Sequence, residues 1–327
     1  MIAPLRSQEI TPPAVPAAVQ TDTRSNKTRA LVLLFLSILC LAVSPLLIRA
    51  VKDSFSVSFQ NLFRFSLACC LLWACAAGRM EPAGIRAHIR GIPAFWPKLM
   101  VLALVIYLHQ TFFLEAIYRI YPGIANLLLQ TTVLFSTFLA LAFLPEERGL
   151  IRNTAFQLSL LAALVGVVLT ITGGFQPGGA AFGPGAVLVL LSALCWSVYS
   201  VAVKRMLASL PASLTTSLVF TLVVPMFLLS HLCVCGGAFF PRADPAGWLV
   251  LALSGLVGGG GGYLFYYSSL PVLGVTTAAS LSLLIPLVTG LLSFFCFGEV
   301  PAPTQLLGGA VLMAGCAVLI RIRLKRE

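Results

Sequence analysis

The sequence is short of charged residues. Only 9% of its 327 residues are Asp, Glu, Lys or Arg, and ten of these are acidic, whereas soluble domains carry about 25%. With 59% hydrophobic residues, the chain has too little polar surface to cover itself in water, and disordered, collagen-like and coiled-coil classes are excluded as well. The three histidines and nine cysteines show no metal-ligand spacing. We therefore expect no metal, no cofactor and no catalytic residue.

What the sequence has in abundance is long apolar runs, and its mean hydropathy is +1.00. A run of about 20 apolar residues is long enough for a helix to cross a bilayer. The runs predict ten transmembrane helices, at 30–50, 61–77, 98–118, 123–144, 155–172, 185–204, 213–233, 248–270, 275–297 and 304–320. Very short connections predict helical hairpins at 119–122, 271–274 and 298–303.

The basic residues predict the orientation of these helices. Of the 21 Lys and Arg residues, 16 fall in segments that share one side of the membrane with both termini. Because cytoplasmic loops carry the excess of positive charge, we expect both termini in the cytoplasm and the protein in a bacterial inner (plasma) membrane. The proline-containing residues 1–28 are expected to form a disordered cytoplasmic tail, and residues 321–327 a basic one.

The second half of the chain repeats the first. The sequence LSILC at 36–40 matches LSALC at 191–195, and LALAFLPEE at 139–147 has its counterpart in LLSFFCFGE at 291–299. These matches define two five-helix repeats, 29–173 and 184–320. Since five is odd, the two copies enter the membrane from opposite sides. The predicted fold is an all-α membrane protein of ten transmembrane helices in two inverted repeats, an architecture of secondary transporters with a substrate site near the bilayer midplane.

Several motifs of the second repeat resemble those of the drug/metabolite transporter superfamily, EamA type. They are Pro286-Leu287-Val288, Phe297-Gly298-Glu299, Gln305-Leu306-Leu307-Gly308-Gly309 and Ala314-Gly315. The first repeat departs from this pattern, since Val133 or Leu134 stands where the proline is expected, although 144–148 (LPEER) is similar to the family's link. The resemblance implies a fold of two five-helix EamA-like repeats. It also implies a transporter rather than an enzyme, exporting small amino-acid-like or amphipathic metabolites by alternating access.

Polar side chains inside the spans are candidates for function, because they are costly in hydrocarbon. For coupling or gating we single out Glu115, His109 and Arg64. Glu115 also fits an interfacial ion pair with Arg119, and Arg64 either extends to the headgroups or binds a carboxylate or phosphate in the cavity. The residues expected to contact substrate are Tyr107, His109, Asn126, Gln130, Tyr199, Tyr263 and Tyr267. The glycines at 258–262 predict either a hinge or close helix packing.

Two other functions fit the same composition. One is an organophosphate or nucleotide-sugar exchanger of the same fold, for which Arg64 is the supporting residue. The other is a multi-span membrane enzyme acting on lipid, which requires a nucleophile–base pair or metal cluster at membrane depth. The expected partners are a small-molecule solute and the lipid bilayer, with protons as a candidate coupling ion. No nucleic acid is expected, and a homodimer is left open.

Overall fold

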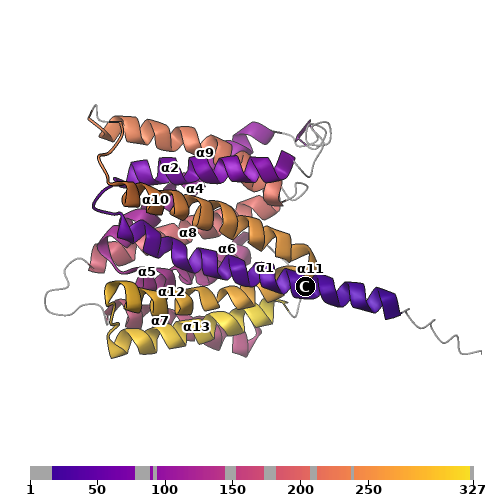
Figure 1. The fold of residues 1–327 in the computed structure, drawn as a ribbon. Coiled ribbons are helices and arrows are strands. Elements are labelled where there is room, and N and C mark those ends of the chain that lie inside the picture. The colour runs from indigo at the N-terminus through magenta and orange to yellow at the C-terminus, as the bar shows by residue number, and fades with distance from the viewer. Residues whose placement is uncertain are drawn as a thin grey trace, which may run out of the picture.

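The computed structural model describes residues 17–77, 89–90, 94–143, 152–172, 182–206, 212–236 and 239–324. Within these ranges the chain is helical and forms no strand (Figure 1). The helices of the first half are α1 (Ala17–Ala50), α2 (Val57–Ala77), α4 (Phe95–Arg119), α5 (Pro122–Leu129), α6 (Thr131–Phe143) and α7 (Thr154–Thr172). Those of the second half are α8 (Phe182–Met206), α9 (Ala212–Val234), α10 (Pro245–Leu253), the π-helix η2 (Ser254–Gly261), α11 (Gly262–Ser282), α12 (Leu284–Phe297) and α13 (Pro303–Leu324).

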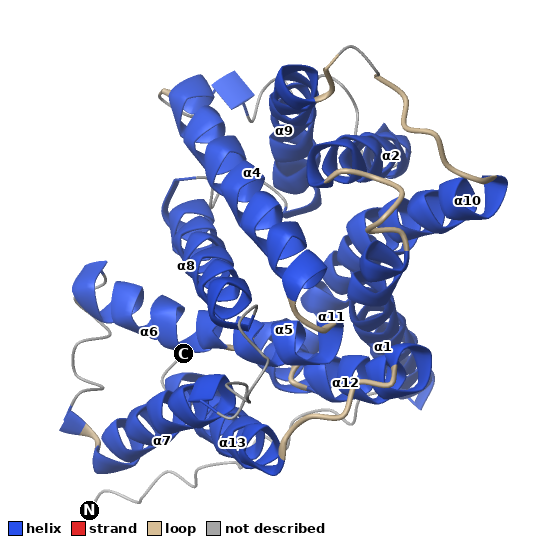
Figure 2. Ribbon diagram, turned by 90° about the vertical axis from the view of Figure 1, so that its left-hand side faces the viewer, coloured by secondary structure: helices blue, strands red, loops and turns tan. Residues whose placement is uncertain are grey.

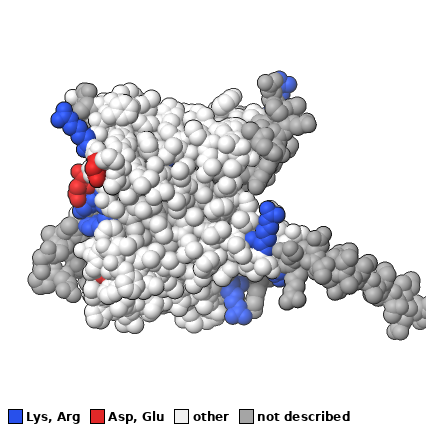
Figure 3. Space-filling view, viewed as in Figure 1, with Lys and Arg blue, Asp and Glu red and all other residues white. Residues whose placement is uncertain are grey.

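Length and composition make most of these helices membrane spans. In the described ranges, nine helical segments are long and apolar enough to cross a bilayer, and α12 is a shorter apolar helix of 14 residues. On the face seen in Figure 3, charged side chains lie at the two ends of the bundle and the middle is uncharged. This distribution matches a hydrocarbon belt between two aqueous faces. The prediction of an all-α, multi-span membrane protein is confirmed.

Several boundaries differ from the sequence prediction by a few residues, as where α13 continues to Leu324, and two differences are larger. Helix α1 begins at Ala17, so residues 17–28, expected in the tail, continue the first helix; after Pro16 no proline interrupts them. The backbone of α11 remains helical through Pro271, where we expected an open turn. The chain still reverses direction between Tyr266 and Ile285, because both residues line one cavity, whereas a straight helix would separate them by about 28 Å.

The packing of the helices follows a twofold pattern. Helix α7 packs against α13, α5 against α12, and α2 against α9. Exchanging the two halves of the chain maps the α7–α13 and α2–α9 pairs onto themselves, while the α5–α12 pair joins the fourth span to the ninth, its equivalent. The same exchange converts the α4–α8 pair into the α11–α1 pair, which is also present. Viewed along the bundle in Figure 2, the α7–α13 pair and the α2–α9 pair occupy opposite edges.

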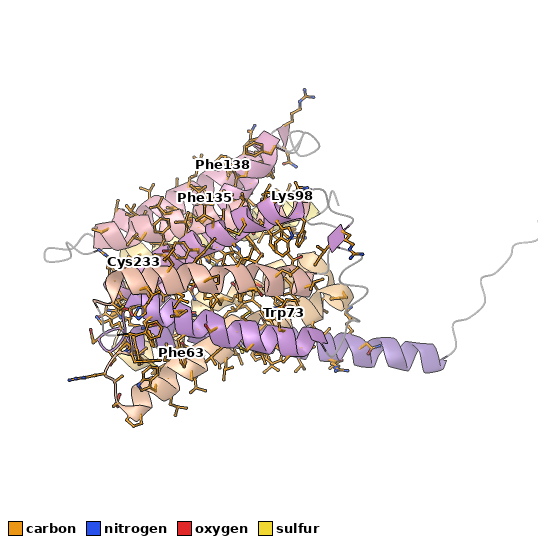
Figure 4. The ribbon with its side chains drawn as sticks, turned by 90° about the horizontal axis from the view of Figure 1, so that it is seen from above. Phe63, Trp73, Lys98, Phe135, Phe138 and Cys233 are labelled. Carbon is orange, nitrogen blue, oxygen red and sulfur yellow. The ribbon has the colours of Figure 1, made fainter. Side chains whose placement is uncertain are left out.

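Equivalent helices of the two halves run in opposite directions. At one end of the bundle, Arg49 near the end of α1 donates a hydrogen bond to the carbonyl of Ile120, and Gly185 near the start of α8 contacts the same isoleucine. At this end α2 starts and α9 finishes, since the rings of Phe59 and His231 lie 5.1 Å apart. Figure 4 shows Phe63 and Cys233 toward this end and Lys98, near the start of α4, toward the other. The two halves are therefore inverted.

Candidate functional site

A cavity of about 260 Å³ lies between the two halves. Helices α1, α2, α4, α5 and α6 line it from the first half, and α8, η2, α11 and α12 from the second. Its basic side chains, Arg64 and His109, sit in the interior of α2 and α4, away from the helix ends. No carboxylate is present among the described lining residues. A small solute held here would be in contact with both halves at once.

Arg64 is a buried cation of this cavity, with only 5% of its surface exposed. Its Nη2 donates to the hydroxyl of Ser44 across 3.2 Å, while Nε and Nη1 have no hydrogen-bond partner. The salt bridge found in the described part of the chain lies elsewhere, between Arg119 and Glu115. Arg64 therefore sits in the membrane interior without a protein counter-charge, a costly arrangement that is a default indication of function.

The glycines of the eighth span allow other helices to approach Arg64 closely. Residues Ser254–Gly261 form the π-helix η2, a helix type that is frequent at functional sites. A Cβ at Gly255 would lie 2.9 Å from the Cα of Arg64, and one at Gly258 would overlap the side chain of Ser44. The glycines therefore allow η2 to pack closely against α1 and α2, in contact with the backbone of Arg64.

His109 is fixed to the second half through Ser192 of α8. Its Nδ1 lies 2.8 Å from the Ser192 hydroxyl and 3.0 Å from the Ser192 carbonyl oxygen, and the hydroxyl donates to the His109 carbonyl. Because a carbonyl oxygen only accepts hydrogen bonds, these contacts favour the tautomer with its proton on Nδ1. The ring of His109 also lies 5.1 Å from that of Trp196. His109 thus connects α4 to α8 beside the cavity.

Two of the amide side chains that line the cavity come from an interrupted helix. The fourth span breaks at Gln130, between α5 and α6, and the corresponding break in the second half lies at Leu283, between α11 and α12. Pro286 lacks an N–H group and so explains the second break, whereas the first occurs without a proline. Asn126, one turn before Gln130, donates to the hydroxyl of Thr289 across 2.7 Å. Both amide residues line the cavity.

Aromatic side chains form the remaining wall. The rings of Tyr263 and Tyr267 are stacked with centroids 6.3 Å apart, and Trp196 lies 6.1 Å from Tyr263. These three residues and Tyr266 line the cavity. Such a wall offers large apolar faces together with phenol and indole hydrogen-bonding groups. It suits a solute with an apolar or aromatic body.

Three predicted site residues lie outside the cavity lining. The ring of Tyr107 packs against Phe227 of α9. Tyr199 is buried beside Trp196, with its ring 5.6 Å away, but does not line the cavity. Glu115 accepts a hydrogen bond from Arg119 at 2.9 Å, and both side chains are substantially exposed at the end of α4. This geometry matches the interfacial ion pair that we considered for Glu115.

The structure adds a polar contact that the sequence reasoning did not place. Glu299, only 3% exposed, follows α12 and accepts hydrogen bonds from the backbone N–H groups of Gly123 and Ile124, at 3.1 and 3.0 Å. These N–H groups belong to the first turn of α5 and have no partner within the helix. Burial raises the pKa of Glu299, while the two N–H groups and the charge of Arg49 oppose that shift. We call this interaction the Glu299 contact.

The Glu299 contact lies at one end of the bundle, where neighbouring hydrogen bonds also join the helices. Arg49 donates to the carbonyls of Ile117 and Ile120, at 2.6 and 2.8 Å. The hydroxyl of Tyr118 accepts a hydrogen bond from Gln60 at 2.7 Å. The signal that pointed to Glu299 was its place in the Phe297-Gly298-Glu299 motif, which we had used as a family marker only. We refer to this region as the Glu299 end.

The fold and the cavity define a class of protein, a multi-span helical membrane protein with a solute-sized cavity between inverted halves. Residues 183–321 match the model of the EamA-like transporter family. A relative from Streptantibioticus cattleyicolor, named as a probable terminal-alkyne amino-acid exporter, is 30% identical over 86% of this chain and 89% of its own. This chain belongs to the EamA-like transporter family.

Further comparisons agree with this assignment. An uncharacterized protein of Pseudomonas aeruginosa is 29% identical over 91% of this chain and 96% of its own length. An uncharacterized transporter of Archaeoglobus fulgidus is 28% identical over 80% of this chain and 86% of its own. A crystal structure with a TM-score of 0.59 and 24% identity covers 92% of this chain and 99% of the other, which shows a shared fold.

Proposed function

We propose that this protein is a secondary transporter that exports small amino-acid-like solutes by alternating access. The observation that carries the proposal is the cavity itself, which lies between the two inverted halves and takes its lining from both. Inverted repeats of this kind bind substrate near the membrane midplane and alternate access by moving one part against the other. The similarity to a relative named as an amino-acid exporter supports this solute class.

The charge distribution of the loops supports an orientation. With both termini in the cytoplasm, the Glu299 end faces outward, because α1 finishes there and α5 begins there. The Glu299 contact and the bonds of Arg49 then lie on the outer side of the cavity. Export would require these bonds to open after a solute has entered from the cytoplasm.

Coupling to protons is part of the proposal, and the cavity contains one group suited to it. The imidazole of His109 can accept and release a proton and lies in the lining, whereas Glu115 lies at the surface. If His109 carries the proton, a His109→Gln variant should lose pH-driven flux and keep solute exchange. The exposed Glu115→Gln variant is the matched control and should keep both activities.

The experiment is solute flux in proteoliposomes. Purified full-length protein is reconstituted, and flux of radiolabelled amino acids, their carboxylate and amine analogues, and a sugar phosphate is measured with and without a pH gradient. We expect saturable flux of at least one amino-acid-like solute above that of protein-free vesicles. Flux of the sugar phosphate alone would favour the organophosphate exchanger, and no flux across the panel would contradict the proposal.

A further inference from the structure

We propose that Arg64 and Asn61 form an anion-binding subsite, and that the solute is a monocarboxylate with an apolar or aromatic body, recognised through its carboxylate rather than through an ammonium group. This inference rests on the proposed transport function and names the chemistry of its substrate. It follows from buried polar atoms that the described protein leaves without partners, and from the charges that line the cavity.

The first step concerns the polar atoms of α2. Arg64 leaves Nε and Nη1 unpartnered, and Asn61, one turn earlier on the same helix and fully buried, leaves both atoms of its amide unpartnered. Buried polar atoms without partners are uncommon, and each costs free energy comparable to a lost hydrogen bond. Two such residues three positions apart lie on one face of the helix. Arg64 therefore brings its unpartnered donors to the cavity, and the Asn61 amide lies one turn away on the same face of α2, outside the described lining.

The second step concerns charge. A guanidinium group presents its N–H donors in a planar fork that fits a carboxylate with two parallel hydrogen bonds. Arg64 uses one of its donors on Ser44, across 3.2 Å, and that hydroxyl is neutral. A solute carboxylate would supply the missing counter-charge at this position. A solute with two negative charges would leave one of them in excess while His109, the other basic side chain among the described lining residues, is neutral.

The third step concerns an ammonium group. The described lining contains no Asp or Glu to pair with it, and the acidic Glu115 and Glu299 are not part of the lining. The faces of Trp196, Tyr263 and Tyr267 offer cation–π contacts, which are weaker than an ion pair at such a depth. The same rings offer a large apolar surface. An amine is therefore tolerated by this cavity without being required.

The size of the cavity limits the body of the solute. A volume of about 260 Å³ is just below the range of drug-sized pockets, which begins at about 300 Å³. Such a cavity accommodates a short alkyl or single-ring carboxylic acid. A nucleotide-sized anion would exceed this volume.

The test is a binding measurement on the full-length protein in nanodiscs by isothermal titration calorimetry. The probes are hexanoate, 3-phenylpropanoate, its uncharged amide 3-phenylpropanamide, L-phenylalanine and phenethylamine, each corrected with empty nanodiscs. The variants are Arg64→Gln, Arg64→Lys, Asn61→Ala and, as the matched control, Arg119→Gln, which removes an exposed arginine outside the cavity. Each variant is first checked for a monodisperse elution profile and a cooperative thermal transition.

We expect at least one of the two monocarboxylates to bind, and the amide and the amine to bind about tenfold or more weakly than the matching acid. Arg64→Gln should weaken binding of the acid by about tenfold and leave binding of the amide unchanged. Arg64→Lys should recover part of the loss, and Arg119→Gln should behave like the wild type. If Arg64→Gln does not fold, Arg64→Lys and Asn61→Ala still decide the matter, because each should weaken the acid more than the amide.

Three results would overturn the inference. They are binding of neither monocarboxylate, equal binding of acid and amide, and equal losses for both ligands in the Arg64 variants, which would indicate a purely structural role. The flux assay separates this failure from failure of the proposed function. Amino-acid flux without an Arg64-dependent preference for carboxylates would refute the subsite alone, whereas absence of flux for every solute would refute transport.

Discussion

Replacing Glu299 by alanine should loosen the first turn of α5. The carboxylate of Glu299 is the hydrogen-bond acceptor for the N–H groups of Gly123 and Ile124, at 3.1 and 3.0 Å. The alanine side chain leaves both N–H groups buried without a partner, and each such group costs about 1–3 kcal/mol. The closed arrangement should therefore lose about 2 kcal/mol or more relative to one in which these amides reach water.

Hydrogen–deuterium exchange measures this loss where it occurs. Since about 1.4 kcal/mol corresponds to a factor of ten, the amides of Gly123 and Ile124 should exchange about 30-fold faster or more in Glu299→Ala. Glu299→Gln keeps one acceptor oxygen and should fall between alanine and the wild type. Glu115→Gln is the matched control, because it removes a carboxylate from an exposed ion pair, an interaction worth about 0–1 kcal/mol.

The result that refutes this reasoning is also local. Unchanged exchange at Gly123 and Ile124 in Glu299→Ala, in a protein with a normal thermal transition, would mean that the two N–H groups have other partners. An equal increase throughout α5 and α12 would instead indicate general destabilisation. Only an increase confined to the start of α5 matches the Glu299 contact.

Three further outcomes are expected. Burial raises the pKa of Glu299, so the closed form binds the carboxyl proton more tightly than an open, hydrated form does. Raising the pH through that pKa should therefore favour the open form. Hydrogen exchange at Gly123 should then increase with pH relative to exchange in Glu299→Gln measured at the same pH. Gly258→Ala should lower the thermal midpoint, at a cost of about 1–3 kcal/mol from overlap with α1, whereas Gly290→Ala, whose Cβ meets no atom within 4 Å, should not. Ser192→Ala should weaken solute binding without abolishing folding, as measured by calorimetry and thermal unfolding, because it removes one of the two hydrogen-bond partners of the His109 Nδ1 atom.

The sequence was sufficient to predict the spans and the repeat. A transmembrane helix is recognised in a sequence by about 20 consecutive apolar residues, and this signal does not depend on the neighbouring helices. The matching segments at 139–147 and 291–299 likewise located the two halves, and the helix pairs of the structure agree with the predicted inversion. The α11 backbone through Pro271 was missed because proline near a turn predicts an interruption, whereas the structure reverses direction with helical geometry retained.

The direction in which each polar side chain points was harder to predict. Tyr107 and His109 are two residues apart on α4, so they lie on different faces of the helix. His109 lines the cavity, while Tyr107 packs against Phe227 of α9. In a soluble helix a polar stripe would distinguish these faces. Helix α4 has apolar residues on every side, because lipid and protein neighbours are both apolar, and the sequence alone gives no such stripe.

The polar groups of the Glu299 end fall into two sets with different consequences for the proposed transport cycle. Along the α5–α12 seam, the Glu299 contact at the end and the bond between Asn126 and Thr289 at the cavity join the two helices. On α2, by contrast, Asn61, Arg64 and the Oε1 atom of Gln60 have polar atoms without partners. Opening the seam breaks bonds that already exist, whereas admitting a solute or water beside α2 supplies bonds that are missing. Solute binding is therefore most favourable at the face of α2, where polar atoms lack partners. The α5–α12 seam is the side that resists opening until the solute is bound.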